Sequence, residues 1–287
     1  MKNRKRIIAL VLALIFALAL AACGSGSKEK LPANRLEAIK QRGYIEVCTE
    51  PYFAPYEFID SSKQGDEQYV GMDIEIAKYI AEKLGVELRL VPLEFSAVLA
   101  SVTEGKYDLA ISALAYSPTR AESMNLSKGY RFDENESSNY GLLVREEDAD
   151  KYPTAESLAF AVIVTQSGSV QEGFVKDQIP TYKEFKVVSS MTDGFLMVKE
   201  GKADACACDI NNGQLYADAN GGLAIANEFR FKIDESTQGT RVGIPLGETE
   251  LTDFVNQCID ELLAEGKTNQ WYQEYSEYAR SLGLDAN

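Results

Sequence analysis

The side chains of this sequence that could do chemistry are its carboxylates, lysines, tyrosines and cysteines, because it contains no histidine. Without histidine there is no Ser-His-Asp or Cys-His nucleophile, no His-ligated zinc site and no imidazole general base. An enzyme with this composition would have to work with carboxylates, lysine, tyrosine or a cofactor.

Two of the five cysteines stand close together, Cys206 and Cys208 in the segment Ala203-Asp204-Ala205-Cys206-Ala207-Cys208. The segment is typical of a strand, so both side chains should lie on one face without the geometry of a mutual disulfide. A Cys-x-Cys pair could also be half of a soft-metal site, but no second pair or histidine stands at ligand spacing. We therefore expect small buried packing residues and no metal site.

The composition bounds the class of protein. The chain has 287 residues, of which 45% are hydrophobic and 25% charged, with a formal net charge of −15. Such an apolar fraction is ordinary for a globular protein of one large or two smaller domains, which excludes a disordered, collagen-like or disulfide-scaffold chain. The negative charge argues against nucleic acid as a partner, since phosphate contacts need clustered Lys and Arg.

The first 22 residues are typical of a targeting segment. Basic residues precede an unbroken apolar run over 7–20, which is shorter than the roughly 20 residues of a spanning helix but fits the h-region of a signal peptide. The following Leu20-Ala21-Ala22-Cys23 resembles the lipobox of bacterial lipoproteins; an ordinary secretory peptide is the alternative. The resemblance implies a signal peptide over 1–22, a lipidated Cys23 on the extracytoplasmic face of the cell membrane, and a flexible tether over 23–33.

From Asn34 onward, strand-like and helix-like segments alternate, which indicates an α/β fold. The expected strands are 44–49, 87–91, 108–111, 140–144, 161–165, 185–188, 204–207 and 240–244. The expected helices are 34–41, 71–85, 96–104, 169–177, 192–200, 248–265 and 268–280. The segments form two series of similar size and order, so we expect two α/β lobes.

One segment carries a family signature. Gly71-Met72-Asp73-Ile74-Glu75 and the helix that it opens resemble the signature of the amino-acid-type extracellular solute-binding proteins (family 3) of ABC importers, although Met72 departs mildly from the pattern. Further matches occur in family order along the whole mature chain. They are Glu50–Phe58, Asp108–Arg120, Gln166–Ser169, Gly201–Asp209, Gly243–Pro245 and the helix over 256–266.

The resemblance implies a type II periplasmic-binding-protein fold, in which two lobes, each a central sheet flanked by helices, are joined by two hinge strands. It assigns 34–143 and 239–287 to lobe 1 and 144–238 to lobe 2. The hinge is expected near 141–144 and 238–240, and the lobes should close on the ligand by a hinge motion.

The resemblance also implies a site for one L-amino acid. Arg120 stands where the family has the arginine that clamps the ligand α-carboxylate through its planar fork. Asp209 stands where a carboxylate receives the α-ammonium group, a role compatible with capping the helix that follows. Backbone groups should complete the clamp at Ser112, Ala113, Ala115, Ser169 and Val170. The family often has a Ser or Thr hydroxyl at position 115, so Ala115 implies one fewer hydrogen bond to the ligand.

Four side chains bear on ligand selectivity. Phe53 and Phe95 match two aromatic positions that sandwich a ligand side chain in the family; plain core packing is the alternative. Glu50 falls where binders of basic amino acids have an acid, and a carboxylate beside aromatic rings suits a guanidinium or ammonium group. A solvated strand-end glutamate is the alternative for Glu50. The neutral Gln166 would not repel a cation. We therefore expect a basic or polar ligand, with arginine or lysine favoured.

Three classes of function compete. The first is a monomeric transport receptor that needs no cofactor, delivers its amino acid to an ABC permease and is held to the membrane by its N-terminal lipid. The second is a sensory module, which would usually continue into a spanning helix and a signalling domain. The third is an enzyme of the same fold, such as a dehydratase or lytic transglycosylase. It would need a pocket acid with a raised pKa, for which Glu50 is the only candidate.

Overall fold

The computed structural model describes residues 31–132, 139–233 and 238–283, and those from Asn34 onward form one compact unit. The expected signal peptide (1–22), Cys23 and nearly all of the tether (23–33) lie outside the described residues. Within the described ranges, no helix combines the length and the apolar character that crossing a bilayer requires.

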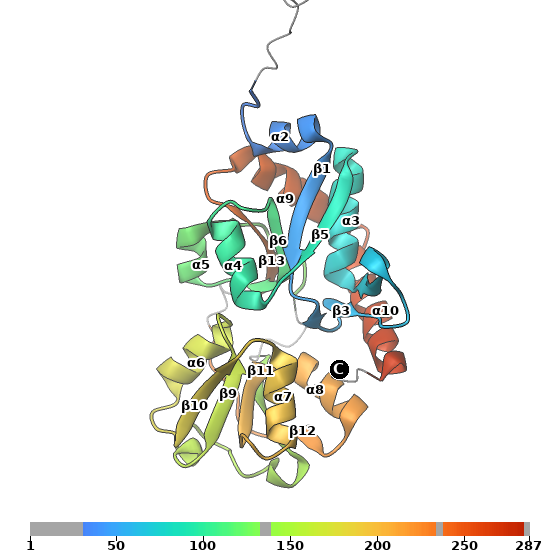
Figure 1. Ribbon diagram of the computed structural model, residues 1–287. Helices are drawn as coiled ribbons and strands as arrows, with labels where there is room; N and C mark the ends of the chain where they lie inside the picture. The colour runs from blue at the N-terminus through green and yellow to red at the C-terminus, as the bar shows by residue number, and fades with distance from the viewer. Residues whose placement is uncertain (1–30, 133–138, 234–237, 284–287) are drawn as a thin grey trace, which may run out of the picture. The chain divides into compact units, whose positions relative to one another are not determined.

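The first lobe is built on a five-stranded sheet with the strand order β5-β1-β6-β13-β7 (Figure 1). β1 runs parallel to both of its neighbours, whereas β13 comes from far along the chain and is antiparallel to β6 and β7. The strands are β1 (Tyr44–Thr49), β5 (Glu87–Pro92), β6 (Leu109–Ala115), β7 (Met124–Leu126) and β13 (Thr240–Pro245). The helices are α2 (Arg35–Arg42), α3 (Met72–Leu84), α4 (Phe95–Thr103), α5 (Pro118–Ser123) and α9 (Thr249–Ala264).

Helices cover both faces of this sheet, as expected for an α/β lobe. On one face, Ile76 of α3 and Ile259 of α9 are fully buried against the strands in one apolar cluster. On the other face, Val98 and Val102 of α4 pack against Cys48 of β1. Burying these apolar side chains is the main free energy that holds the sheet between its helices.

The start of α3 is set by a close backbone approach at Gly71. The φ of Gly71 is 132°, and a Cβ placed there would lie 2.1 Å from the carbonyl oxygen of Tyr56, so only glycine fits. The N–H groups of Met72 and Asp73 then donate to the carbonyl oxygens of Pro55 and Tyr56, at 3.2 and 2.8 Å. The first turn of α3 is thereby attached to the loop that precedes β3 (Glu57–Ile59).

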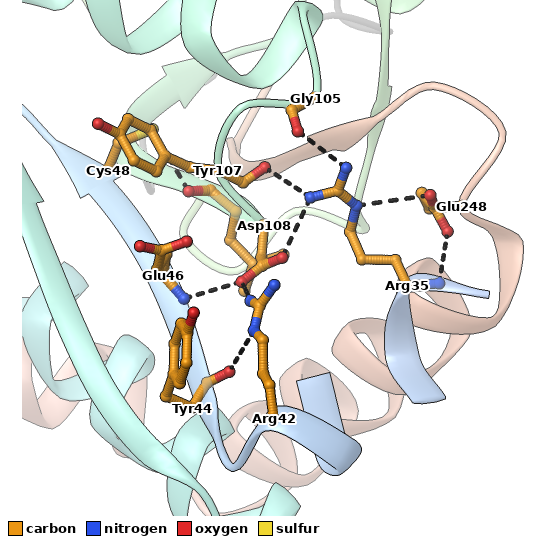
Figure 2. A network of polar contacts seen from close by, with 10 residues as sticks. Arg35, Arg42, Tyr44, Glu46, Cys48, Gly105, Tyr107, Asp108 and Glu248 are labelled. Atoms are coloured by element: carbon orange, nitrogen blue, oxygen red, sulfur yellow. Dashed lines mark hydrogen bonds and ion pairs between the residues drawn. The ribbon is translucent and has the colours of Figure 1, made fainter. Parts of the chain in front are cut away.

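A buried carboxylate attaches the first helix to this lobe (Figure 2). Asp108 accepts hydrogen bonds from Arg35 at 3.1 Å, from the Arg42 guanidinium, and from the backbone N–H of Glu46 at 2.8 Å. The Arg35 backbone N–H donates to Glu248, next to the start of α9, at 3.1 Å. Because the Asp108 side chain is only 1% exposed, these donors replace the water that it lost on folding.

The second lobe repeats the plan with the strand order β10-β9-β11-β8-β12. Its strands are β8 (Tyr140–Arg145), β9 (Val162–Gln166), β10 (Glu184–Val188), β11 (Ala205–Asp209) and β12 (Leu223–Ile225). Its helices are α6 (Val170–Gln178), α7 (Met191–Lys199) and α8 (Ile210–Asn220), with short 3-10 turns at Glu146–Asp148 and Glu156–Leu158. Cys206 and Cys208 lie in one buried cluster and are free thiols, as expected for packing residues. Two five-stranded sheets with their own helices confirm the two-lobed α/β fold.

The expected lobe boundary between residues 143 and 144 falls inside a strand of the second sheet. β8 covers these residues, and it pairs with β11 from Tyr140 to Val144 and with β12 on its other edge. Residues 140–143 therefore belong to the second sheet and not to lobe 1, and a bend within them would break two ladders of hydrogen bonds. The connection between the sheets comes earlier, between β7 and β8. Before it, Arg131 pairs with Thr240 of the returning chain.

A small third sheet was missed at the sequence level. It joins β2 (Tyr52–Phe53), β3 (Glu57–Ile59) and β4 (Tyr69–Val70), with a 3-10 turn at Gly65–Gln68 before β4. Strands of two or three residues are too short to show alternation, and the same holds for β7 and β12. The last helix, α10 (Lys267–Leu282), packs on this sheet, and the cluster beneath it includes Leu215 of the second lobe.

Candidate ligand-binding site

One cavity lies between the two lobes, and all eleven residues expected to bind ligand line it. They come from the ends of β1, β6, β9 and β11, from the starts of α4 and α6, and from β2 and α5. They are Glu50, Phe53, Phe95, Ser112, Ala113, Ala115, Arg120, Gln166, Ser169, Val170 and Asp209. The carboxyl ends of strands are the usual place for ligands in open α/β sheets.

Arg120 is a buried cation at one side of this cavity. It lies in the short helix α5, whose N-cap Ser117 accepts from the Arg120 N–H at 3.2 Å. Its guanidinium donates to the carbonyl oxygens of Ala115 at 2.7 Å and of Gly168, in the second lobe, at 3.0 Å. The side chain also lies over the ring of Phe95, with 5.4 Å between the guanidinium carbon and the ring centroid.

No carboxylate among the described residues balances the charge of Arg120. The residue is 7% exposed, and no described residue places a carboxylate in ion-pair contact with it. Burial lowers the pKa of Arg120 to about 10, so it stays protonated at neutral pH. Of the five N–H donors of a guanidinium, two are taken by carbonyl groups, which leaves three that can meet an anion.

Asp209 is a cavity-lining residue from the second lobe. It is the last residue of β11 and caps α8, where its Oδ1 accepts from the N–H of Asn212 at 3.0 Å. The expected capping role is therefore confirmed, and the residue lines the cavity as well. The side-chain amide of Asn212 then donates to the carbonyl oxygen of Ala54, in the first lobe, at 2.8 Å.

A kink in β6 brings its backbone to the cavity. Ala113 has a φ of 47°, which is unusual for any residue other than glycine, and the pairing of β6 with β13 changes register around it. The Ala113 N–H turns away from the ladder and donates to Oδ2 of Asp73 at 2.7 Å. Strained backbone of this kind concentrates at functional sites.

The start of α6 supplies one backbone donor where two were expected. The Ser169 side chain caps the helix by accepting from Glu172, but its own N–H already donates to the carbonyl oxygen of Gln166 at 3.3 Å. Val170, as the first residue of the helix, has no helical acceptor for its N–H.

The expected aromatic pair, Phe53 and Phe95, also differs from a simple sandwich. Phe95 faces Arg120, whereas Phe53 packs on Tyr56, with 5.7 Å between the ring centroids of Phe53 and Tyr56.

Glu50 is a buried acid of the cavity. It follows β1, is 2% exposed, and its Oε1 has no hydrogen-bond partner among the described residues. Burial raises the pKa of Glu50 well above its usual range, more than a hydrogen bond from Gln166 lowers it. Nearby Asp193 and Glu94 raise the pKa further. Glu50 is therefore no solvated strand-end residue.

A second pocket acid, Glu57, was missed, so Glu50 is not the only candidate. The Ser112 hydroxyl donates to Glu57 at 3.1 Å and accepts from the Glu50 backbone N–H at 3.0 Å. Behind it, Asp73 is fully buried, and the Tyr130 hydroxyl donates to it at 2.9 Å. Burial raises the pKa of both acids, that of Asp73 to about 6, and the neighbouring Asp73 raises the pKa of Glu57 further. Two neighbouring buried carboxyl groups disfavour being ionised together.

A family model for bacterial extracellular solute-binding proteins, family 3, matches residues 45–278. The chain belongs to this family. This solute-binding protein is 23% identical to a probable histidine-binding protein of Campylobacter jejuni, covering 94% of this chain and 98% of the other. It is 25% identical to an arginine-binding extracellular protein of Bacillus subtilis, covering 92% and 94%.

A solved structure agrees with this assignment. The solute-binding protein superposes on an amino acid ABC transporter substrate-binding protein from Streptococcus pneumoniae, bound to L-arginine, with a TM-score of 0.77. The two are 31% identical over 85% of this chain and 98% of the other. The fold and the family expected from the sequence are thus confirmed.

Six further residues line the cavity of this solute-binding protein without having been expected there. They are Tyr56, Glu57, Tyr140, Gln171, Met191 and Thr240. Glu57 and Tyr56 stand inside a matched segment, where an acid between aromatic residues could have been noticed. Met191 and Thr240 carried no signal, because their place in the cavity depends on how α7 and the returning chain pack.

Proposed function

We propose that this solute-binding protein receives one L-amino acid with a basic side chain, with arginine favoured, for an ABC importer. The observation that carries the proposal is the presence of two buried ionisable groups in one cavity. Arg120 is charged and has no carboxylate partner among the described residues, and one oxygen of Glu50 has no hydrogen-bond partner among them. An arginine ligand would give each of them a partner, because its α-carboxylate complements Arg120 and its guanidinium complements Glu50. The arginine-binding relative and the arginine-bound structure support this choice.

The lobes would close around the ligand. Polar contacts already join them around the cavity, from Arg120 to Gly168, from Asn212 to Ala54 and from Thr192 to Tyr52. Ligand entry requires these contacts to part, and closure then places Asp209 beside the α-ammonium group. We propose lobe 1 as residues 34–132 with 240–287 and lobe 2 as 140–233, moving about the connections between them.

Titration calorimetry with the twenty amino acids, ornithine, citrulline and spermidine tests the proposal. We expect arginine or lysine to bind best, and Arg120→Ala to lower the affinity for every L-amino acid by at least a hundredfold. Arg89→Ala removes an exposed arginine paired with Glu87 and serves as the control, with unchanged affinity expected. Binding that survives Arg120→Ala, or the absence of binding by any α-amino acid, would refute the clamp.

The same experiment addresses catalysis. The curated relatives are binding proteins, and we propose that this chain also binds its ligand without changing it. Ligand recovered after overnight incubation should have an unchanged mass. A new product would favour the enzyme alternative, with Glu50 and Glu57 as candidate acids.

We further propose that the chain is a lipoprotein anchored through Cys23, which presents the monomeric binding lobes to a permease on the extracytoplasmic face. The basic and apolar leader and the cysteine at position 23 support this. Mass spectrometry of the membrane-extracted protein should find a diacylated Cys23 at its N-terminus. Cys23→Ser should release the protein from the membrane while leaving ligand affinity unchanged. A membrane-bound Cys23→Ser variant would contradict the anchor.

A further inference from the structure

The ligand cavity adjoins a second hollow at Glu50. Glu50 lines both the cavity and this hollow of about 600 Å³, which lies between β2, the start of α4 and the start of α7. Arg120 is shared with a third hollow instead. The cation and the acid of the cavity thus border different neighbouring spaces, and the space beside the acid is the second hollow.

The walls of the second hollow are acidic and polar. Glu94 comes from the first lobe and Asp193 from the second, and no lysine or arginine is among its described lining residues. Both acids act electrostatically on Glu50, whose Oε1 is buried and has no hydrogen-bond partner among the described residues. Ser189 adds a hydroxyl to the wall and donates to Asp193 at 3.2 Å. Such walls attract a cation and offer acceptors to its N–H groups.

We propose that the hollow beyond Glu50 is an extension subsite, which lets the protein bind basic L-amino acids substituted on their terminal nitrogen. This inference rests on the proposed function, since it takes the α-carboxylate at Arg120 and the basic group at Glu50. In a closed pocket, one extra methylene lowers the affinity by roughly 10–200-fold. Here the added atoms enter open space between Glu94 and Asp193. The preferred class carries a second cationic group on that extension.

The test compares three ligands by titration calorimetry, namely L-arginine, Nω-propyl-L-arginine and Nω-(2-aminoethyl)-L-arginine. We expect the propyl derivative to bind within tenfold of arginine, and the aminoethyl derivative to bind at least as tightly as arginine. Glu94→Gln with Asp193→Asn should weaken the aminoethyl derivative at least fivefold more than it weakens the propyl derivative. Glu104→Gln, on the third hollow, is the matched control and should change neither ratio.

A steric variant gives an independent readout. Thr192→Trp places a large ring in the hollow, so it should lower the affinity for both derivatives more than tenfold relative to arginine. A propyl derivative that binds a hundredfold more weakly than arginine would overturn the subsite while leaving the proposed function intact. Equal weakening of both derivatives by the double charge variant would overturn its cationic preference. If arginine, lysine and every other amino acid fail to bind, the proposed function itself fails.

Discussion

At the scale of single residues, the site consists of ionisable groups that are buried away from water and that a charged ligand could pair. Arg120 keeps its charge through carbonyl groups and an aromatic face, whereas Glu50 and Glu57 are shifted towards their neutral forms by burial. A cationic ligand side chain would favour the ionised form of Glu50. Binding should therefore release protons, and their number can be measured.

We expect the affinity for arginine to rise with pH, by up to about tenfold per unit, while Glu50 is still protonated in the empty protein. The raised pKa of Glu50 means that a bound guanidinium must displace its proton, and Asp193, Glu94 and Gln166 are the groups that act on it. Calorimetry between pH 5 and 8, in buffers of different ionisation enthalpy, counts the released protons.

Citrulline, the neutral analogue of arginine, is the control ligand and should show no such rise with pH. Glu50→Gln should remove the pH dependence for arginine and bring its affinity close to that of citrulline. A pH dependence that persists in Glu50→Gln would assign the titration to another group.

Asp73 makes a separate prediction about stability. Because burial raises its pKa to about 6, the folded protein holds this proton more tightly than the unfolded chain does. Its contribution to the free energy of unfolding is therefore complete below pH 4 and lost as the pH rises through 6. Asp73→Asn removes this loss, so the variant should gain on the parent, between pH 4 and 7, by about 1–3 kcal/mol. Urea unfolding of the parent and the variant at pH 4 and pH 7 measures this change. If the difference in free energy of unfolding between the two proteins were the same at both pH values, the prediction would be contradicted.

At the scale of elements, the site depends on three short backbone devices: the kink of β6 at Ala113, the cap of α8 at Asp209 and the close approach at Gly71. The kink and the close approach meet at Asp73, which accepts from the Ala113 N–H while its own N–H is held by Tyr56. Moving α3 would therefore move the cavity wall.

Gly71→Ala should lower the free energy of unfolding by at least about 2 kcal/mol, because its Cβ would collide with the Tyr56 backbone. Ligand affinity should fall with it, since the displaced α3 carries Asp73. The control is Gly173→Ala in α6, where nothing lies within 4 Å of the added Cβ and alanine should stabilise by up to about 1 kcal/mol. Thermal unfolding and calorimetry read both effects, and an unaffected Gly71→Ala variant would refute the clash.

The sequence predicted the elements with strong periodicity, and residues at matched positions, such as Arg120 and Asp209, do line one cavity. It could not predict that Glu57, Asp73 and Ser112 lie together, because they come from three elements that meet only through packing. The misplaced lobe boundary has a similar cause. The apolar run of β8 looks alike whether it crosses between lobes or lies within a sheet, and only its partners β11 and β12 decide.

At the scale of the whole molecule, the Asp108 network and the candidate ligand cavity lie at opposite ends of β6. Asp108 precedes β6 and holds Arg35 and Arg42, whereas Ala115 at the other end of the strand faces the ligand cavity. Damage at one end should therefore leave the other functional.

We expect Asp108→Asn to lower the free energy of unfolding by about 2–4 kcal/mol, since both arginines lose a buried anionic partner. Ligand affinity at 25 °C should stay within twofold of the parent. Chemical denaturation and titration of the same preparation measure the two quantities. A loss of affinity comparable to that of Arg120→Ala would show that the two ends are coupled.

The Asp108 network also has a mechanical consequence (Figure 2). If the protein is anchored through its N-terminus as proposed, a pulling force on the folded body is transmitted through residue 34. The first residue to take the load is Arg35, which is fastened to Asp108 and to Glu248 at the same time. The force is therefore shared between the central sheet and α9 instead of unwinding α2 turn by turn. The proposed opening and closing of the lobes would then leave this point of attachment in place.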